Sequence, residues 1–284
     1  MNEPRINRRQ FLQSGAIAAS LLAAGRLPLL AAEGGSGSGI DKGVGEHAIK
    51  PIRDYLQRFS PSTGSLRDRK SYTLGYDIVH WDGANPKTGM PANSVVGNVV
   101  IQREKRPGGV GYEIAQHMMI GGVKNSIEAQ IRCQADEVSV QDWTVRFHST
   151  RPEGGVDPLS EIKETGSNKK GRIEIHGGNF RYGYDAEHPV VTQWTVLDLL
   201  IRKASPTVAA TFDLLQDLSL FKPSHRLLYD GETLLRLKGE KNVVLQTYAQ
   251  TGEGVLPVHY LCDERRCPHL VTTSILSWAL TSVT

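Results

Sequence analysis

Apolar residues alternate with polar residues along most of the chain from residue 71 onward. In residues 71–81, for example, Tyr72, Leu74, Tyr76 and Ile78 take every second position. A two-residue period is typical of a β-strand with one buried face, and Gly, Asn and Asp divide the runs as they divide strands. The pattern predicts strands at residues 71–81, 95–104, 112–120, 126–134, 138–148, 172–176, 180–184, 225–229, 233–238, 243–250, 256–263 and 270–280.

Short polar segments between these runs predict the connections. Gly121-Gly122, Gly177-Gly178-Asn179 and Asp230-Gly231 are typical of tight turns, because glycine and asparagine accept the backbone angles that such turns require. Residues 151–171 are rich in proline, glycine and charge. This composition predicts an exposed loop or a ragged hairpin.

Two stretches follow a helical period instead. Residues 48–59 place apolar side chains three and four positions apart, which predicts a short amphipathic helix. Residues 190–220 predict two further short helices, because Ser205-Pro206 is typical of an N-cap followed by proline in the first turn. One helical face consists of Val196, Leu199, Leu200 and Lys203, and the next consists of Val208, Phe212 and Leu215.

Together these elements predict a mainly β (α+β) fold. A curved antiparallel sheet or incomplete barrel would carry the two short inserted helices, because a sheet of a dozen strands wraps to protect its edges. We expect residues 47–284 to form a single β-rich domain. Residues 33–46, with the run Gly-Gly-Ser-Gly-Ser-Gly, are typical of a flexible linker.

The N-terminal segment carries paired arginines ahead of a moderately apolar stretch. Arg8 and Arg9 precede Phe11 and Leu12, and residues 14–24 are rich in alanine and leucine. This pattern resembles a twin-arginine translocation signal over residues 1–32. The resemblance implies export by the twin-arginine translocase as a folded protein, to a periplasmic or otherwise exported location. If the segment is not cleaved near Ala31-Ala32, it remains as an N-terminal membrane anchor, and membrane contact is expected only there.

The charge distribution argues against nucleic acid as a partner. The first 32 residues contain four arginines and one glutamate, which account for the whole net charge of +3. The remaining chain is about neutral, whereas binding to phosphate backbones needs a clustered basic surface.

The C-terminal third has a loose likeness to known exported proteins. Residues 226–232 and 252–263 look similar to the closing strands of uncharacterised exported β-sheet proteins, some of which resemble the half-barrel carriers of lipoproteins. This resemblance implies a curved sheet and brings no catalytic motif.

Three cysteines are present, and two of them lie close together in sequence. Cys262 and Cys267 bracket a four-residue turn, so their sulfurs could form a disulfide in an oxidising compartment. Two alternatives remain open, namely free thiols and a metal site in which His269 joins the two sulfurs. Cys133 is expected in the core.

The sequence predicts no catalytic, cofactor-binding or metal-binding residues, although two groups of side chains have the chemistry for such a site. His80, His117, His148 and His259 lie in apolar strands and could converge on a metal or catalytic site. Asp77, Glu113 and Glu128 could supply a carboxylate pair for glycoside chemistry. The aromatic residues of the strands are expected to build the core rather than a pocket.

The sequence therefore favours an exported, non-enzymatic protein that binds an apolar or lipid-like ligand in a curved β-sheet. One alternative is an envelope hydrolase or metal-dependent enzyme that uses the strand histidines. Another is a structural or interaction protein that offers a sheet edge to a partner.

Overall fold

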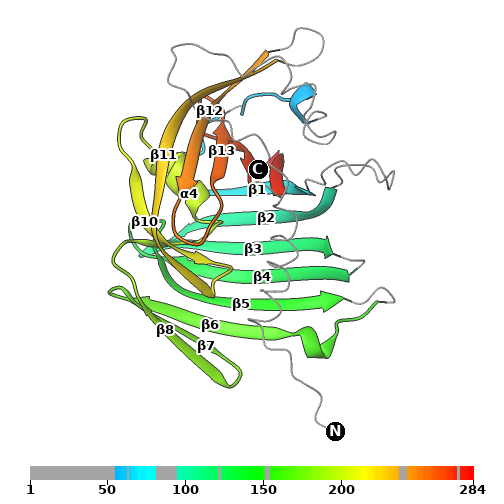
Figure 1. Ribbon diagram of the computed structural model, residues 1–284, viewed down its shortest axis with the longest axis vertical. Coiled ribbons are helices and arrows are strands. Elements are labelled where there is room, and N and C mark those ends of the chain that lie inside the picture. The colour runs from blue at the N-terminus through cyan, green and yellow to red at the C-terminus, as the bar shows by residue number, and fades with distance from the viewer. Residues whose placement is uncertain are drawn as a thin grey trace. The chain divides into compact units, whose positions relative to one another are not determined.

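The computed structural model describes residues 55–62, 64–80, 95–120, 123–150, 154–236, 242–273 and 276–284. All of them belong to the unit that spans residues 39–284, and their strands join in one sheet of 15 strands (Figure 1). The first eight strands are β1 (Ser71–His80), β2 (Val95–Arg106), β3 (Gly109–Ile120), β4 (Val123–Cys133), β5 (Val140–Thr150), β6 (Ile162–Lys169), β7 (Arg172–Gly177) and β8 (Phe180–Asp185). The others are β9 (Val190–Val191), β10 (Ala210–Gln216), β11 (Leu220–Arg236), β12 (Asn242–Thr251), β13 (Val258–Cys262), β14 (Pro268–Thr272) and β15 (Leu276–Val283).

The strand order places the first and last strands side by side in the middle of the sheet. Strands β1 to β8 succeed one another toward one edge, and β15 back to β9 succeed one another toward the other edge. All neighbours are antiparallel except β9 and β10. The pair β1–β15 continues beyond β15, since the backbones of Thr73 and Thr284 exchange two hydrogen bonds. Figure 1 shows that β11 to β13 run in a different direction from β2 to β6, as expected for a strongly twisted sheet.

Side chains connect the two ends of this open sheet. The ring of Tyr184 on β8 stacks on Phe221 of β11 with centroids 5.2 Å apart. The Ser219 hydroxyl, between β10 and β11, donates to the carboxylate of Glu164 on β6 at 2.5 Å. Asp213 on β10 accepts hydrogen bonds from the backbone N–H groups of Glu187 and His188, which lead the chain from β8 to β9. The ends therefore meet through side chains and not through strand pairing.

Helix α4 (Val196–Lys203) fills the inner side of the sheet. Its residues from Val196 to Ile201 are all buried, and they join one hydrophobic cluster with inward residues of the sheet. A helix buried on every side lies inside the core rather than on the surface. The sheet contributes apolar side chains from alternate positions, among them Leu74, Ile101, Tyr112, Ile131 and Val145.

The buried carboxylate of Asp198 on α4 binds three strands to the helix. It accepts hydrogen bonds from Tyr72 (2.6 Å), Tyr112 (2.8 Å), Nε of Arg103 (2.8 Å) and Nε of Arg202 (3.0 Å). Burial, reinforced by the charge of Asp198, holds the pKa of both phenols well above the usual range, so both remain donors. Burial alone would lower the pKa of Arg103, but the nearby Asp198 outweighs it and the pKa is raised. The guanidinium therefore stays charged.

The predicted fold class is confirmed, and so is the helix through Val196 to Lys203. The second predicted helix, with Val208, Phe212 and Leu215, is wrong, because residues 210–216 form strand β10. Four consecutive residues of β10, from Phe212 to Leu215, are buried. A strand covered on both faces loses its alternation, and a short apolar run of this kind cannot be told from a helix by its period.

Three smaller predictions also need correction. Asp230-Gly231 is not a turn between strands but a bulge inside β11, where Gly231 has a φ of +97°. Residues 162–169, expected in the loop at 151–171, form β6, preceded by the short helix η1 (Pro158–Ser160). Residues 270–280 are divided between β14 and β15.

Several predictions fall on residues outside the described part of the chain. These include the signal-like segment, the linker, most of the helix at 48–59 and the turn at Gly121-Gly122. The structure describes residues 55–59 of that helix: residues 55–57 are helical, and residues 58 and 59 are not. In the described residues, no helix has the length and apolar character needed to cross a membrane.

Gly166 on β6 leaves room for the ring of Trp143 on the adjacent strand β5. A Cβ atom at position 166 would lie 2.1 Å from Cζ2 of Trp143. We therefore expect Gly166→Ala to lower the free energy of unfolding by about 1–3 kcal/mol, as overpacking does. Urea unfolding would measure this loss.

Gly64→Ala serves as the matched control, because its new Cβ would meet only Nη2 of Arg69 at 3.4 Å. It should change stability by no more than about 0.5 kcal/mol. The cost of Gly166→Ala should also shrink in a Trp143→Phe background, which lacks the clashing atom. An equal cost in both backgrounds would contradict the explanation.

Candidate functional site

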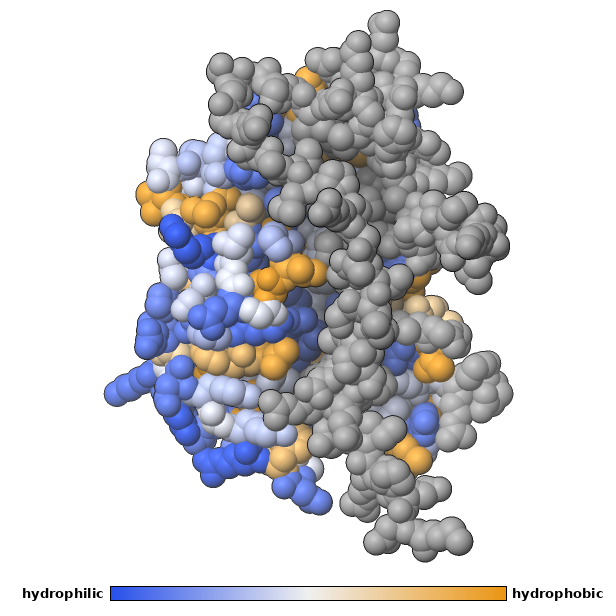
Figure 2. Space-filling view, viewed as in Figure 1, coloured by the Kyte–Doolittle hydropathy of each residue, from blue (hydrophilic) through white to orange (hydrophobic). Residues whose placement is uncertain are grey.

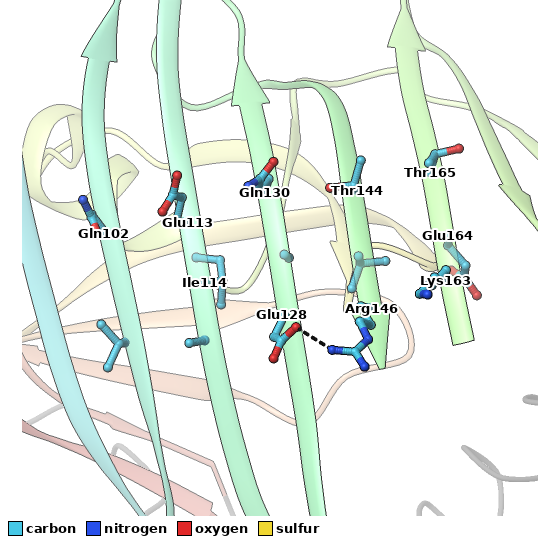
Figure 3. A pocket seen from close by; sticks show the side chains of 14 residues that line it. Gln102, Glu113, Ile114, Glu128, Gln130, Thr144, Arg146, Lys163, Glu164 and Thr165 are labelled. Carbon is cyan, nitrogen blue, oxygen red and sulfur yellow. Dashed lines mark hydrogen bonds and ion pairs between the residues drawn. The ribbon is translucent and has the colours of Figure 1, made fainter. Parts of the chain in front are cut away.

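A hollow of about 600 Å³ lies on the outer face of strands β2 to β6, opposite the side that α4 fills. Two rows of cross-strand neighbours run over it, as Figure 3 shows for most of their members. We call the first the glutamine row, and it consists of Gln102, Glu113, Gln130, Thr144 and Thr165. The second, the arginine row, consists of Val100, Ala115, Glu128, Arg146 and Lys163.

Strand alternation explains why polar side chains gather here. Inward neighbours such as Ile101, Ile131 and Val145 fill the core, so every second residue of the same strands points outward. In the arginine row, Val100 and Ala115 are short, whereas the side chains around them are long. The hollow therefore has an apolar floor with polar groups around it. Where the hydropathy colours are visible in Figure 2, hydrophilic residues predominate, with stripes of hydrophobic residues between them.

The charged groups of the arginine row are paired and remain accessible. Arg146 lies 3.2 Å from Glu128 and 2.7 Å from Glu161, and Lys163 lies 3.2 Å from Glu161. Hydrogen bonds from Arg146, and next from Lys163, lower the pKa of Glu161. Such exposed pairs contribute little to folding, so their hydrogen-bonding capacity is available to a ligand.

The hollow contains two of the three carboxylates considered for glycoside chemistry. Glu113 and Glu128 lie on adjacent strands and both line it, whereas Asp77 on β1 is not among the lining residues. Glu128 is ion-paired with Arg146 and Glu113 lies 3.9 Å from Arg106. Both are thus held as surface ion pairs rather than in the apolar surroundings that prepare a general acid.

Two of the four strand histidines come together beside Ser126. His117 on β3 and His148 on β5 both pair across β4 with Ser126, whose hydroxyl lies 2.9 Å from Nδ1 of His117. Burial, with a further contribution from Lys124, lowers the pKa of His117, which favours the neutral ring. The other two, His80 on β1 and His259 on β13, lie on different strands, so the four do not converge.

The remaining predicted site residues divide into two groups. Arg8, Arg9, Phe11 and Leu12 lie outside the described residues, so the export signal stays a prediction. Cys262 and Cys267 are buried free thiols in this structure, and the disulfide between them stays a prediction. Burial raises the pKa of both, to about 12 for Cys267.

Sequence reasoning could not identify the two rows as a unit. Their members are single outward residues of five strands, and only the register of the sheet aligns them. What the site offers is hydrogen bonding from amides, hydroxyls, carboxylates and two cations along a line across the strands. Comparison with protein-family models, with curated proteins and with solved structures found no match to this chain.

Proposed function

We propose that this protein is an exported binding protein that holds an extended, hydroxyl-rich ligand, such as an oligosaccharide, across strands β2 to β6. The observation that carries the proposal is the hollow with its two rows of cross-strand neighbours over an apolar floor. Export is part of the proposal through the twin-arginine-like segment at residues 1–32.

The chemistry of the rows suits a sugar chain. Glutamine, glutamate and arginine side chains are planar and can bond to two neighbouring hydroxyl groups at once. Val100 and Ala115 offer small apolar contacts for the C–H groups of a sugar ring. Because strands lie about 4.8 Å apart, five strands present a line of about 19 Å. A short oligosaccharide could follow that line.

The location of the hollow favours this ligand over an apolar one. The inner side of the sheet, which would shelter an apolar ligand from water, is occupied by the buried residues of α4. On the outer face, Val100 and Ala115 are the apolar members of the two rows, and the other eight members are polar or charged. The apolar lining of the hollow comes from Val100, Ile114, Ala115, Ala129 and Val145, and the polar side chains of the two rows interrupt it, which suits a sugar chain better than a long acyl chain.

Ala115→Trp is expected to weaken ligand binding at least tenfold, because the indole would occupy the hollow. The probes are short oligomers of glucose and of N-acetylglucosamine, titrated into the protein and followed by calorimetry. Tenfold corresponds to about 1.4 kcal/mol of binding free energy. Val244→Trp on β12 is the matched control, since Val244 is also an exposed apolar strand residue and lies away from the hollow.

Two results would contradict the proposal. One is the absence of binding to every oligosaccharide tested, and the other is equal binding by the wild type and Ala115→Trp. Vesicles of phosphatidylglycerol and a long-chain fatty acid form a separate arm of the titration. Binding in that arm alone, unaffected by Ala115→Trp, would favour the apolar or lipid-like ligand instead.

A further inference from the structure

A buried group of three potential metal ligands lies at the turn between β13 and β14, away from the hollow. Asp263, Cys267 and His269 each offer one ligand atom, and these atoms all lie within 4.8 Å of one another. We call these residues the Asp263 cluster. Within the residues that the structure describes, it is the only group of three His, Cys, Asp or Glu side chains with this property.

The turn itself brings the three side chains together. Oδ1 of Asp263 accepts hydrogen bonds from the backbone N–H groups of Arg265 and Cys267, both at 2.9 Å. Arg266, with a φ of +64°, reverses the chain so that Cys267 and His269 face back toward Asp263. Cys267 and His269 are two positions apart at the start of a strand, so their side chains lie on the same face.

The distances are close to those of a metal site. Nε2 of His269 lies 3.1 Å from Oδ2 of Asp263. Two ligand atoms bound at about 2.0 Å to a tetrahedral ion are separated by about 3.3 Å, so this pair needs almost no movement. The sulfur of Cys267 lies within 4.8 Å of both of these atoms. A zinc–sulfur bond is about 2.3 Å long, so a tetrahedral site needs the sulfur about 3.5 Å from each of them, an approach of at most about 1.3 Å.

Nδ1 of His269, the ring nitrogen that does not contact Asp263, has a hydrogen-bond partner, as the second nitrogen of a metal-binding histidine normally has. Nδ1 of His269 is hydrogen-bonded to the hydroxyl of Tyr55, and the ring of Phe59 packs edge-on against the imidazole with centroids 4.7 Å apart. A partner on the second nitrogen fixes the tautomer and the orientation of a ligating imidazole. In the metal-free structure Nε2–H of His269 donates to Oδ2 of Asp263. A bound metal ion would take the place of that proton, and the ring would then carry its proton on Nδ1 and donate it to the hydroxyl of Tyr55.

The segment at residues 55–62 also covers the cluster. The backbone N–H and the hydroxyl of Ser62 donate to Oδ2 of Asp263 at 2.8 and 2.6 Å. All three cluster residues are at most 4% exposed. Three different ligating groups buried together are unusual, because a carboxylate, a thiol and an imidazole each lose hydration on burial.

We propose that Asp263, Cys267 and His269 bind a divalent transition-metal ion of the zinc class through carboxylate, thiolate and imidazole. One thiolate with one imidazole and one carboxylate favours Zn²⁺ over the hard cations Ca²⁺ and Mg²⁺, which prefer oxygen ligands alone. The fourth position of a tetrahedral ion is left to a ligand from outside the cluster. A disulfide between Cys262 and Cys267 would use the same sulfur, so the metal site requires the reduced protein.

Cobalt provides the direct test, because a Co²⁺–thiolate bond absorbs in the near ultraviolet. The full chain, reduced and stripped of metal by a chelator, is titrated with Co²⁺ and then with Zn²⁺. We expect one equivalent of Co²⁺ to produce the charge-transfer band and Zn²⁺ to abolish it. Cys267→Ser should lose the band, whereas Cys262→Ser, which removes an equally buried neighbouring thiol, should keep it.

A second pair of variants tests the imidazole and its partner. His269→Gln should weaken Co²⁺ binding strongly, and Tyr55→Phe, which keeps the ring and removes only the hydroxyl, should weaken it about tenfold. Circular dichroism checks that each variant is folded. The proposal would be overturned if the folded, reduced wild type gave no charge-transfer band. A band of equal strength in Cys267→Ser would overturn it too, since the sulfur would then belong to Cys133 or Cys262.

Discussion

Asp198→Ala is expected to lower the free energy of unfolding by about 3–5 kcal/mol, the cost of breaking a buried charge pair by removing one partner. The carboxylate of Asp198 accepts four side-chain hydrogen bonds, and its own side chain and that of Arg103 have no exposed surface. After the substitution, Glu137 is the one anionic partner that remains to Arg103 among the residues that the structure describes. The phenol of Tyr72 loses its acceptor inside the core. Urea or guanidinium unfolding, followed by circular dichroism, would measure the loss.

Asp142→Ala is the matched control for this experiment. Asp142 also pairs with an arginine, Arg132, but both side chains are well exposed to solvent. The expected change is at most about 1 kcal/mol, since solvent screens such pairs. Tyr72→Phe should cost less in the Asp198→Ala background than alone, because the hydroxyl it removes has already lost its partner. A cost for Asp198→Ala as small as that of Asp142→Ala would contradict the account of the network.

Asp213→Ala is expected to have a similarly large effect, about 3–5 kcal/mol, for a different reason. The side chain of Asp213 is buried and accepts three backbone hydrogen bonds, from Glu187 and His188 at 3.0 Å and from Ser224 at 2.9 Å. Glu187 and Ser224 are exposed and His188 is partly exposed, so each N–H that loses its acceptor costs about 1 kcal/mol or somewhat more, the lower end of the range for a buried donor. Hydrogen exchange should show the amides of Glu187, His188 and Ser224 losing protection together.

Asp213→Asn keeps the size of the side chain but removes its negative charge and one of its two acceptor oxygens. One of the two carboxylate oxygens becomes an NH₂ group, which would face a backbone N–H, so this variant should also be destabilised. Asp185→Ala is the control, since Asp185 lies on β8, is exposed, and pairs with Arg172 at the surface. Unchanged protection of the three amides in Asp213→Ala would contradict the proposed role of Asp213.

Much of the fold follows from the sequence because strand alternation is a local property. The alternating runs around Tyr72 and Tyr112 predict β1 and β3, since every second residue is apolar and one face of each strand is buried. The alternation pattern fails at β10, because both faces of this strand are buried and the residues from Phe212 to Leu215 therefore follow a helical spacing. It fails again at Gly231, because a glycine that makes a bulge looks like one that makes a turn.

The candidate sites were harder to predict from the sequence than the fold was. Glu113 and Glu128 could be singled out as carboxylates on strands, but their common hollow depends on the register between β3 and β4. Arg103 and Asp198 are 95 positions apart, and nothing local to either one predicts the other. In the Asp263 cluster the sequence indicated Cys267 and His269, yet it paired them with Cys262 rather than with Asp263, whose orientation is set by the turn.

The neighbouring positions of β1 and β15 have a consequence for the order in which the protein folds. The hydroxyl of Thr281 bonds to the backbone carbonyl of Gly75, 206 positions earlier in the chain. Strand β1 leaves the ribosome long before its neighbour β15, because about 200 residues lie between them. Until then β1 presents an unpaired edge, and the long loop that β15 must close makes folding slow. The pairing of β15 therefore decides when this edge of β1 stops being open to association with other chains.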